Sequence, residues 1–362
     1  MRSPPARPAR RSAGLTLVEL VVAAGLMTIL IVALLTLVDD FLGLWQRSEL
    51  RRRTAEEASG VVGLLSGDLV SLERGPRGDL LAEWVFFDTD GDGVAESKWP
   101  RVRLVRHASP RELALLQAGR EQPERGEGLL EVVWAVLPAR AGVPDADRRA
   151  EGVLWRGERI YGSEEGLSVF DPRFLSSTGH PAAGSVEEVS NGVLWLGLEF
   201  ATQTTLLYDG WRLGSGLEHA VASWDAWKRG RANAERHVWN EFGASLPDPA
   251  LRPLLPRRVR LEVELEQERD LKRRTRLVRP AEPADSTLAV EDGRRLPRAR
   301  GAFVRVGAEW MQVTAVSGDS VTVRRGVRGT AAALHERGAL VHYGGTLVRE
   351  VPLSTGQEDW AQ

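Results

Sequence analysis

An apolar run near the N-terminus is the feature that most constrains this chain. From Leu15 to Val38 the only charged residue is Glu19. Roughly 24 residues at about 1.5 Å each form a helix of roughly 36 Å, enough to cross a hydrocarbon core of about 30 Å. Residues 1–14 carry four arginines and no acid, whereas Asp39 and Asp40 follow the run. We therefore expect a single-pass membrane segment with a cytoplasmic N-terminus and the bulk of the chain on the other side.

Two common kinds of N-terminal segment fit this run less well. A secretory signal peptide has an apolar region of about 7–15 residues followed by an A-x-A-like cleavage site. This run is longer, and no such site follows Val38. A plain signal anchor fits the length but leaves Glu19 without a role. A carboxylate at the centre of a spanning helix costs on the order of 2–3 kcal/mol, so such residues are functional by default.

The segment from Gly14 to Leu20, Gly-Leu-Thr-Leu-Val-Glu-Leu, resembles the processing signature of type IV pilins and type II secretion pseudopilins. The resemblance implies that a prepilin peptidase cuts after Gly14 and that Leu15 becomes the methylated N-terminal residue. Glu19 is then the fifth mature residue, which in this family pairs with the terminal amine of a neighbouring subunit during assembly. Opposite charges attract strongly in a low-dielectric medium, so the pair would offset the desolvation of both groups.

The chain departs from the family pattern in two ways. Its first mature residue would be leucine, where phenylalanine or methionine is commoner. Its apolar run contains no proline, so the helix kink of many pilins is not expected. The resemblance also implies a location in the inner membrane, with the C-terminal domain in the periplasm. The domain boundaries that follow from it are a leader at 1–14 and a transmembrane or filament-core helix at 15–38.

The helix is expected to continue beyond the apolar run. No proline occurs between Val38 and Pro76, and Gly75 and Gly78 favour an end near Leu72. Residues 39–75 are therefore predicted to form an amphipathic continuation whose apolar face packs on a sheet. The apolar positions recur at helical spacing: Ala58, Val61, Val62, Leu65 and Leu69.

From about Leu80 the pattern changes to short strands. We therefore predict an α+β protein in which a long N-terminal helix packs on an antiparallel β-sheet; the resemblance implies a pilin-like arrangement, with the β domain at 76–283. Val259 to Leu265 alternates apolar and charged residues, which predicts a half-buried strand whose polar face meets solvent. Other apolar or alternating runs lie at 81–87, 101–106, 129–137, 153–156 and 194–200.

The order of motifs between Leu194 and Glu266 is similar to that of the minor pseudopilin J of type II secretion. An apolar strand is followed by the Asp209-Gly210 turn, further tryptophans, and Leu255-Pro256 leading into an alternating strand. The similarity implies partnership with other minor and major pseudopilins. Any tryptophan-bearing antiparallel sheet is the alternative interpretation.

Residues 284–344 are predicted to form a small inserted β module, and 345–362 a last strand with a tail. The spacing of Arg325-Gly326, Gly329-Thr330, His335 and Gly338 resembles that of a small β module found in phage-tail and other surface proteins. Its His335 is expected to be structural. The formal net charge of -2 gives no global field that would attract nucleic acid, so no nucleic-acid partner is expected. A basic cluster in the module is accordingly interpreted as a solvated face: Arg324, Arg325 and Arg328.

An acidic segment between two predicted strands matches the start of a calcium loop. Asp88, Asp90 and Asp92 occupy positions one, three and five, and Gly93 occupies position six. The bidentate glutamate of position twelve is missing, and Glu96 at position nine could serve instead. The alternative is an acidic hairpin turn, because Asp-Gly pairs form such turns without a metal.

The sequence carries no recognisable catalytic motif. With 0 cysteines there is no thiol nucleophile and no cysteine-ligated metal. Its 6 histidines form no His-x-x-x-His pair, and no nucleophile elbow, Walker loop or dinucleotide fingerprint occurs. We expect a non-enzymatic minor pseudopilin at the tip of a type II secretion pseudopilus. The alternatives are a minor pilin of a type IV pilus or DNA-uptake filament, and a membrane-tethered binding module that forms no filament.

Overall fold

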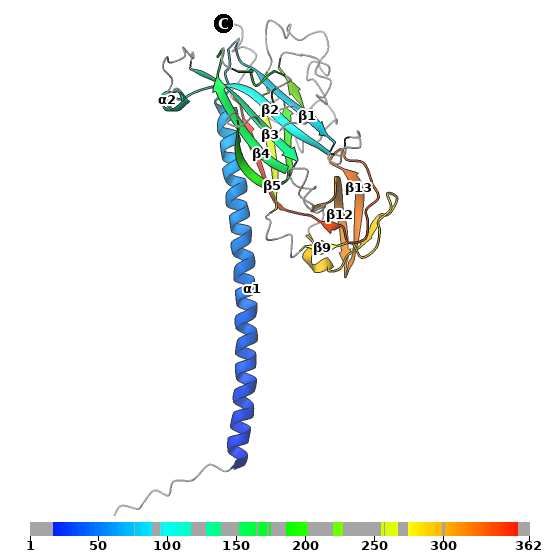
Figure 1. Cartoon of the computed structure of the whole chain (residues 1–362). Coiled ribbons are helices and arrows are strands. Elements are labelled where there is room, and N and C mark those ends of the chain that lie inside the picture. The colour runs from blue at the N-terminus through cyan, green and yellow to red at the C-terminus, as the bar shows by residue number, and fades with distance from the viewer. Residues whose placement is uncertain are drawn as a thin grey trace, which may run out of the picture. The chain divides into compact units, whose positions relative to one another are not determined.

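The computed structural model divides the chain into two compact units, Met1–Arg53 and Thr54–Gln362. Helix α1 (Leu17–Val70) begins in the first unit and ends in the second. Figure 1 shows this helix together with the strands of the second unit. The structure describes residues 17–75, 77–88, 95, 97–116, 128–138, 152–163, 166–171, 174, 186–201, 220–226, 255–256, 258–266, 274–298 and 301–353.

Within the first unit, the described residues form the N-terminal part of α1. The 20-residue stretch Leu20–Asp39 is long and apolar enough to cross a membrane, and none of it is buried. Its length and composition are compatible with a membrane anchor or a signal sequence. The hydroxyl groups of two threonines donate hydrogen bonds to backbone carbonyls one turn earlier in the same helix. Thr28 donates to the Ala24 carbonyl at 2.9 Å, and Thr36 donates to the Val32 carbonyl at 3.1 Å. Polar side chains are therefore accommodated without any external partner.

In the described part of the second unit, nine strands form one antiparallel sheet in the order β15-β8-β5-β4-β3-β2-β1-β7, with β6 paired to β5. Between β2 and β3 lies the short helix α2 (Pro110–Leu116). The expected combination of an N-terminal helix with an antiparallel sheet is confirmed. The strands are β1 (Leu80–Phe87), β2 (Ser97–His107), β3 (Leu129–Pro138), β4 (Gly152–Ile160), β5 (Glu187–Ala201), β6 (Ala220–Val221), β7 (Trp224–Asp225), β8 (Arg258–Leu265) and β15 (Gly345–Pro352).

The large sheet is strongly curled. Trp84 of β1 and Trp195 of β5 have ring centroids only 5.7 Å apart, although three strands separate β1 from β5 in the sheet order. In a flat sheet, four strand spacings would hold the two strands roughly 19 Å apart. The curl creates a concave side that a helix can fill.

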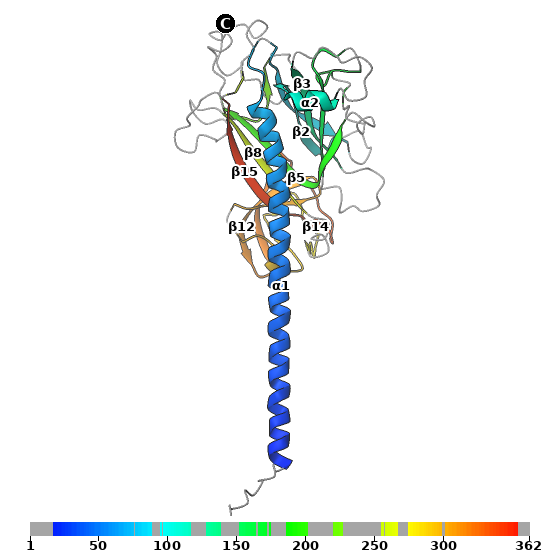
Figure 2. The same ribbon diagram turned by 90° about the vertical axis from the view of Figure 1, so that its left-hand side faces the viewer.

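The C-terminal part of α1 packs on this sheet. Figure 2 shows it lying across strands β5, β8 and β15. The predicted apolar face is confirmed, since all five of its residues are at most 2% exposed: Ala58, Val61, Val62, Leu65 and Leu69. They share one hydrophobic core with buried side chains of the large sheet, including Trp134, Leu196 and Leu261. The helix ends at Val70, and Leu72 then bridges to Arg106 of β2.

A second, smaller sheet has a hydrophobic core of its own. The chain leaves the large sheet after β8 and returns as β15, which pairs with β8 along its whole length. The four-stranded sheet has the order β10-β13-β12-β11, and β14 pairs with β9. The elements are β9 (Thr275–Arg276), β10 (Thr287–Ala289), η3 (Gly293–Arg295), β11 (Phe303–Val306), β12 (Glu309–Ser317), β13 (Ser320–Val327) and β14 (Leu340–Val341). The core is mostly aliphatic, with Leu288, Val304, Met311, Val313 and Val321 fully or almost fully buried.

Arg328 joins the small sheet to the large one. Its Nη1 lies 2.9 Å from Glu264 Oε2, and its Nη2 pairs with Glu262. Its backbone φ of 53° lies in the left-handed region, which a non-glycine residue rarely adopts. The guanidinium also lies 4.0–4.7 Å from the centroids of three aromatic rings, Trp195, Phe303 and Trp310.

The interpretation of the basic cluster as a solvated face is therefore wrong for two of its three arginines. Arg325 pairs with Glu309 through two bonds, and the side chains of Arg325 and Arg328 are 8% and 7% exposed. Only Arg324 is exposed. His335 is structural as expected, because its Nε2 lies 2.8 Å from Glu309 Oε2 in a buried contact.

The polar side of β8 also differs from expectation. Glu264 and Glu266 are buried rather than solvated, because the small sheet covers this end of the strand. Burial raises the pKa of Glu264, although Arg328 acts in the opposite direction. Glu266 contacts His342 Nδ1 at 2.5 Å and pairs with Arg274. An alternating pattern identifies a strand with two unlike faces, but it does not reveal what covers the polar one.

Candidate functional site: the anchored helix

The predicted site residues fall largely outside the described part of the chain. Gly14 and Leu15 precede it. Glu19 lies in the N-terminal turns of α1, and its side chain is not among those described. Asp88 directly follows β1, whereas Asp90, Asp92 and Glu96 are outside the described residues. Among the residues that the structure does describe, no group of three or more histidine or acidic side chains could hold a metal ion.

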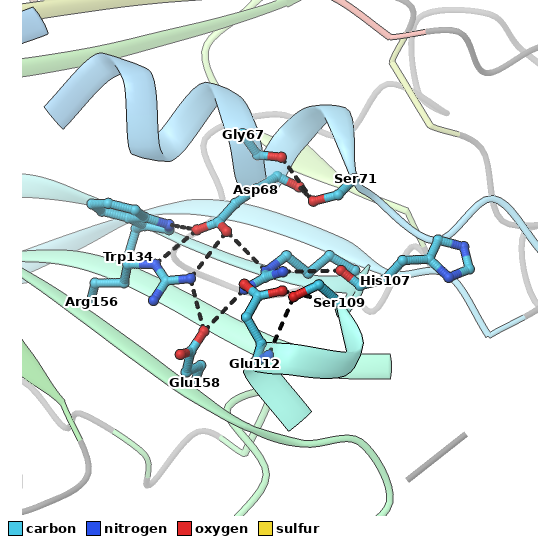
Figure 3. A network of polar contacts seen from close by, with 10 residues as sticks. Gly67, Asp68, Ser71, His107, Ser109, Glu112, Trp134, Arg156 and Glu158 are labelled. Carbon is cyan, nitrogen blue, oxygen red and sulfur yellow. Dashed lines mark hydrogen bonds and ion pairs between the residues drawn. The ribbon is translucent and has the colours of Figure 1, made fainter. Parts of the chain in front are cut away.

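The described part of the site is the attachment of α1 to the sheet, and Asp68 is its centre (Figure 3). Asp68 lies in the last turn of α1, two residues before its end at Val70, and is 6% exposed. Its Oδ2 accepts a hydrogen bond from Trp134 Nε1 at 2.8 Å and another from Arg156 Nε at 2.9 Å. Its Oδ1 accepts from Arg156 Nη2 at 3.1 Å and forms an ion pair with Arg106 Nε at 2.9 Å. One helical carboxylate thus holds side chains of β2, β3 and β4.

A second carboxylate connects the two arginines. Glu158 Oε2 accepts from Arg156 Nη2 at 2.9 Å and from Arg106 Nη2 at 3.1 Å. Burial alone would lower the pKa of Arg156, but hydrogen bonds and charge from Asp68, with a contribution from Glu158, raise it overall. Each of these buried or partly buried arginines has an acidic neighbour, which is the condition for burying ions without a large penalty.

The network ends at helix α2. Arg106 Nη2 donates to Glu112 Oε1 at 2.7 Å, and this bond is the main reason why the pKa of Glu112 is lowered to about 2. Glu112 also accepts from the Ser109 backbone at 2.7 Å, while the Ser109 hydroxyl accepts from the Glu112 backbone at 3.3 Å. This reciprocal pair is a capping box that starts α2.

Asp68 was not predicted to be a functional residue, although its position in the helix carries a signal. An acidic residue in the last turn of a helix faces the negative end of the helix dipole, which is unfavourable unless a cation compensates. Two arginines provide that compensation here. The partners themselves were not predictable, because Arg156 is 88 positions away in sequence and meets Asp68 only through the sheet register.

No protein-family model matches the sequence, and a comparison with curated proteins finds no significant match. A function can therefore be inferred only from the sequence and from the geometry of α1 and the sheet. What it provides is mechanical: one continuous helix, apolar and exposed at its N-terminal part, with buried ion pairs and a hydrophobic core at its C-terminal part.

Proposed function

We propose that this chain is a minor pseudopilin of a type II secretion system. A prepilin peptidase cuts it between Gly14 and Leu15, and its N-terminal helix then carries it into the tip of the pseudopilus to support protein export. The observation that carries the proposal is helix α1, because an exposed apolar segment with a nearby carboxylate, Glu19, continues into a part fixed to an antiparallel sheet. The pilin-like relation of helix and sheet is part of this proposal.

In the proposed mechanism the chemistry is assembly. The apolar part of α1 leaves the bilayer to pack on the helices of neighbouring subunits, and Glu19 sets the register by pairing with a neighbour's terminal amine. Force applied to the helix during growth of the filament would reach the folded domain through Asp68 and the surrounding core. A buried, bidentate ion pair suits this role because it cannot slide as a purely apolar contact can.

Mass spectrometry of the mature N-terminus tests the processing step. We expect the chain, expressed with a prepilin peptidase, to begin at Leu15 and to carry one extra methyl group. Gly14→Val should leave the precursor uncut, whereas Gly25→Val, a matched change where an added Cβ meets nothing within 4 Å, should be processed normally. A wild-type chain that still begins at Met1 in the presence of the peptidase would refute the proposal.

The role of Glu19 is tested by incorporation into the filament. Glu19→Gln should co-purify and cross-link with other pilin-like subunits at least roughly tenfold less than wild type, the effect of losing about 1.4 kcal/mol or more of pairing energy. The control is Glu49→Gln, because Glu49 is also on α1 but pairs with Arg52 and Arg53 of its own helix. Normal incorporation of Glu19→Gln would contradict the assembly mechanism.

The same N-terminal signature would serve a type IV pilus or a DNA-uptake filament. Deletion of the gene separates these candidates, since loss of exported proteins supports the secretion assignment and loss of pili or of DNA uptake supports the other. A chain that is processed but never co-purifies with pilin-like subunits would instead be a membrane-tethered binding module.

We also propose calcium as a ligand of the acidic segment that begins at Asp88. Calcium added to chelator-treated protein should raise the melting temperature, and the increase should grow with the calcium concentration relative to its Kd. Asp90→Asn and Asp92→Asn should remove this effect. Magnesium should not substitute, because it requires a tighter octahedral site. If the segment is only a hairpin turn, calcium will leave the melting temperature unchanged.

A further inference from the structure

Helix α1 carries an apolar stripe that extends past the end of its 20-residue apolar stretch. The stripe consists of Val38, Phe41, Leu42 and Trp45, whose spacing of i, i+3, i+4 and i+7 places them on one helix face. All four are exposed, at 44%, 66%, 46% and 61%. A contiguous exposed apolar patch of this kind marks a site of interaction with a protein or a membrane.

The stripe ends at a charged cluster. One turn beyond Trp45, on the same face, lies Glu49, which accepts hydrogen bonds from Arg52 and Arg53 at 2.9 Å and 3.0 Å. These bonds lower the pKa of Glu49 to about 2, so its carboxylate stays ionised at any physiological pH. Along its axis, the surface of α1 therefore changes from an apolar segment to the aromatic residues Phe41 and Trp45, and then to the charged cluster at Glu49.

Distances along the helix match the layers of a bilayer. Glu19 and Asp39 are separated by 20 residues, or roughly 30 Å, which equals the typical thickness of the hydrocarbon core. With these two acids at the core boundaries, Phe41 and Trp45 begin roughly 3–9 Å above the outer boundary, within or at the edge of the headgroup layer. Side chains of a helix lean toward its N-terminus, so both rings are directed back toward the membrane.

A placement based on the apolar run alone gives a different depth. If Leu15 to Val38 were centred in the bilayer, Glu19 would lie roughly 4 Å inside the hydrocarbon and Trp45 would be in water. Tryptophan prefers the interface, where its ring is apolar and its N–H finds a partner, and such anchors set the depth and tilt of a spanning helix.

We propose that the stripe formed by Val38, Phe41, Leu42 and Trp45 is a membrane-interface anchor. Its partner is the phospholipid headgroup layer on the side where the helix leaves the membrane, and it holds α1 at the depth where Glu19 and Asp39 flank the hydrocarbon. The inference requires a membrane-spanning α1, but it does not require cleavage after Gly14 or filament assembly. Its failure would leave the N-terminal mass measurement untouched, so the two proposals can fail separately.

Because the chain has 0 cysteines, single-cysteine probes can be placed without a background. The full-length chain is reconstituted in phosphatidylethanolamine–phosphatidylglycerol vesicles with a fluorophore on Leu42→Cys or Arg52→Cys. We expect the label at 42 to be quenched by a headgroup nitroxide and to be several-fold less accessible to aqueous iodide than the label at 52. Iodide access equal to that at 52 would overturn the proposal. Shielding of position 42 from both quenchers would also overturn it, because a second copy of the chain would then cover the stripe.

A second measurement tests whether the aromatic residues set the depth. A label on Val32→Cys reports the position of the helix relative to the bilayer centre. Phe41→Ala/Trp45→Ala should shift the depth of this label, whereas Leu64→Ala/Val70→Ala should not, although Leu64 and Val70 are similarly exposed residues of the same helix. An unchanged depth in Phe41→Ala/Trp45→Ala would show that the aromatic rings do not anchor the helix.

Discussion

Asp68 in the last turn of α1 and Trp134 in the middle of β3 are joined by a hydrogen bond of 2.8 Å between a carboxylate oxygen and the indole Nε1. Trp134 is fully buried, so its N–H has no access to water. The bond therefore satisfies a polar group that the hydrophobic core could not otherwise accommodate. It also fixes the last turns of the helix against the centre of the large sheet.

Asp68→Asn should destabilise the second unit strongly. The change removes the charge shared by Arg106 and Arg156, and breaking one side of a buried ion pair typically costs about 3–5 kcal/mol. Urea denaturation of the detergent-solubilised chain, followed by tryptophan fluorescence, measures the loss. Glu291→Gln, at an exposed acid, serves as the control and should change stability by less than about 0.5 kcal/mol. Equal stability of the two variants would show that the network does not hold the helix.

Arg328 is predicted to be the main polar attachment of the small sheet. Arg328→Lys keeps the charge and the backbone strain but loses the planar contact with three aromatic rings, so we expect a loss of about 1–2 kcal/mol. Arg328→Ala should cost about 3–5 kcal/mol, because Glu264 is then buried without its cation. Limited proteolysis and urea denaturation measure both effects. Arg324→Ala, at an exposed arginine of β13 four residues earlier, should be nearly neutral.

Glu309 should make stability depend on pH in the acid range. Burial alone would raise its pKa, but hydrogen bonds from Arg325, His335 and the backbone lower it to about 2. A carboxyl group with a lowered pKa stabilises the fold above its unfolded pKa of about 4.3, and this stabilisation is lost as pH falls toward 2.

The expected contribution of Glu309 at neutral pH is about 3 kcal/mol, from about 1.36 kcal/mol for each unit of pKa. Glu309→Gln should therefore be less stable at pH 7 and should lose much of the decline in melting temperature between about pH 4.3 and pH 2. Glu336→Gln, at an exposed acid, should keep the wild-type pH profile. A parallel pH profile for Glu309→Gln and wild type would rule out this linkage.

Two glycines with nearly the same φ angle allow backbone strain to be distinguished from steric conflict. Gly162 and Gly192 have φ values of 70° and 68°. A Cβ at Gly162 would meet nothing within 4 Å, whereas one at Gly192 would lie 2.0 Å from the Glu266 carbonyl oxygen. Gly162→Ala should cost only the conformational penalty of about 1–2 kcal/mol. Gly192→Ala should cost clearly more, as measured by urea denaturation, because it must also displace backbone next to β8.

The long helix could be predicted because its determinants are local. Periodic apolar residues identified the buried face from Ala58 to Leu69, and the predicted end near Leu72 is within two residues of the observed end at Val70. The antiparallel sheet was predictable for the same reason, since short alternating runs are bounded by glycine and proline.

The ion pairs of the fold were not predictable. Arg325 and Arg328 were expected to be solvated because an arginine in an exposed strand and one that pairs with a distant glutamate look alike in sequence. Glu264 and Glu266 were expected on an open strand face, and burial by a segment that comes later in the chain has no local signature. Asp68 could have been flagged by its unfavourable position in the helix dipole, but its partners depend on sheet register.

The pairing of β8 with β15 has a consequence for how such a chain can grow. Leu265 lies opposite Gly345, so the two strands are already neighbours at the point where the polypeptide departs toward the small sheet. A two-residue turn could close this hairpin, and the described strands between the two, β9 to β14, all belong to other sheets. Insertion or loss of a whole segment at this position would leave the registers of β8 and β15 unchanged. The region between these strands can therefore acquire new surfaces while the large sheet that holds α1 stays the same.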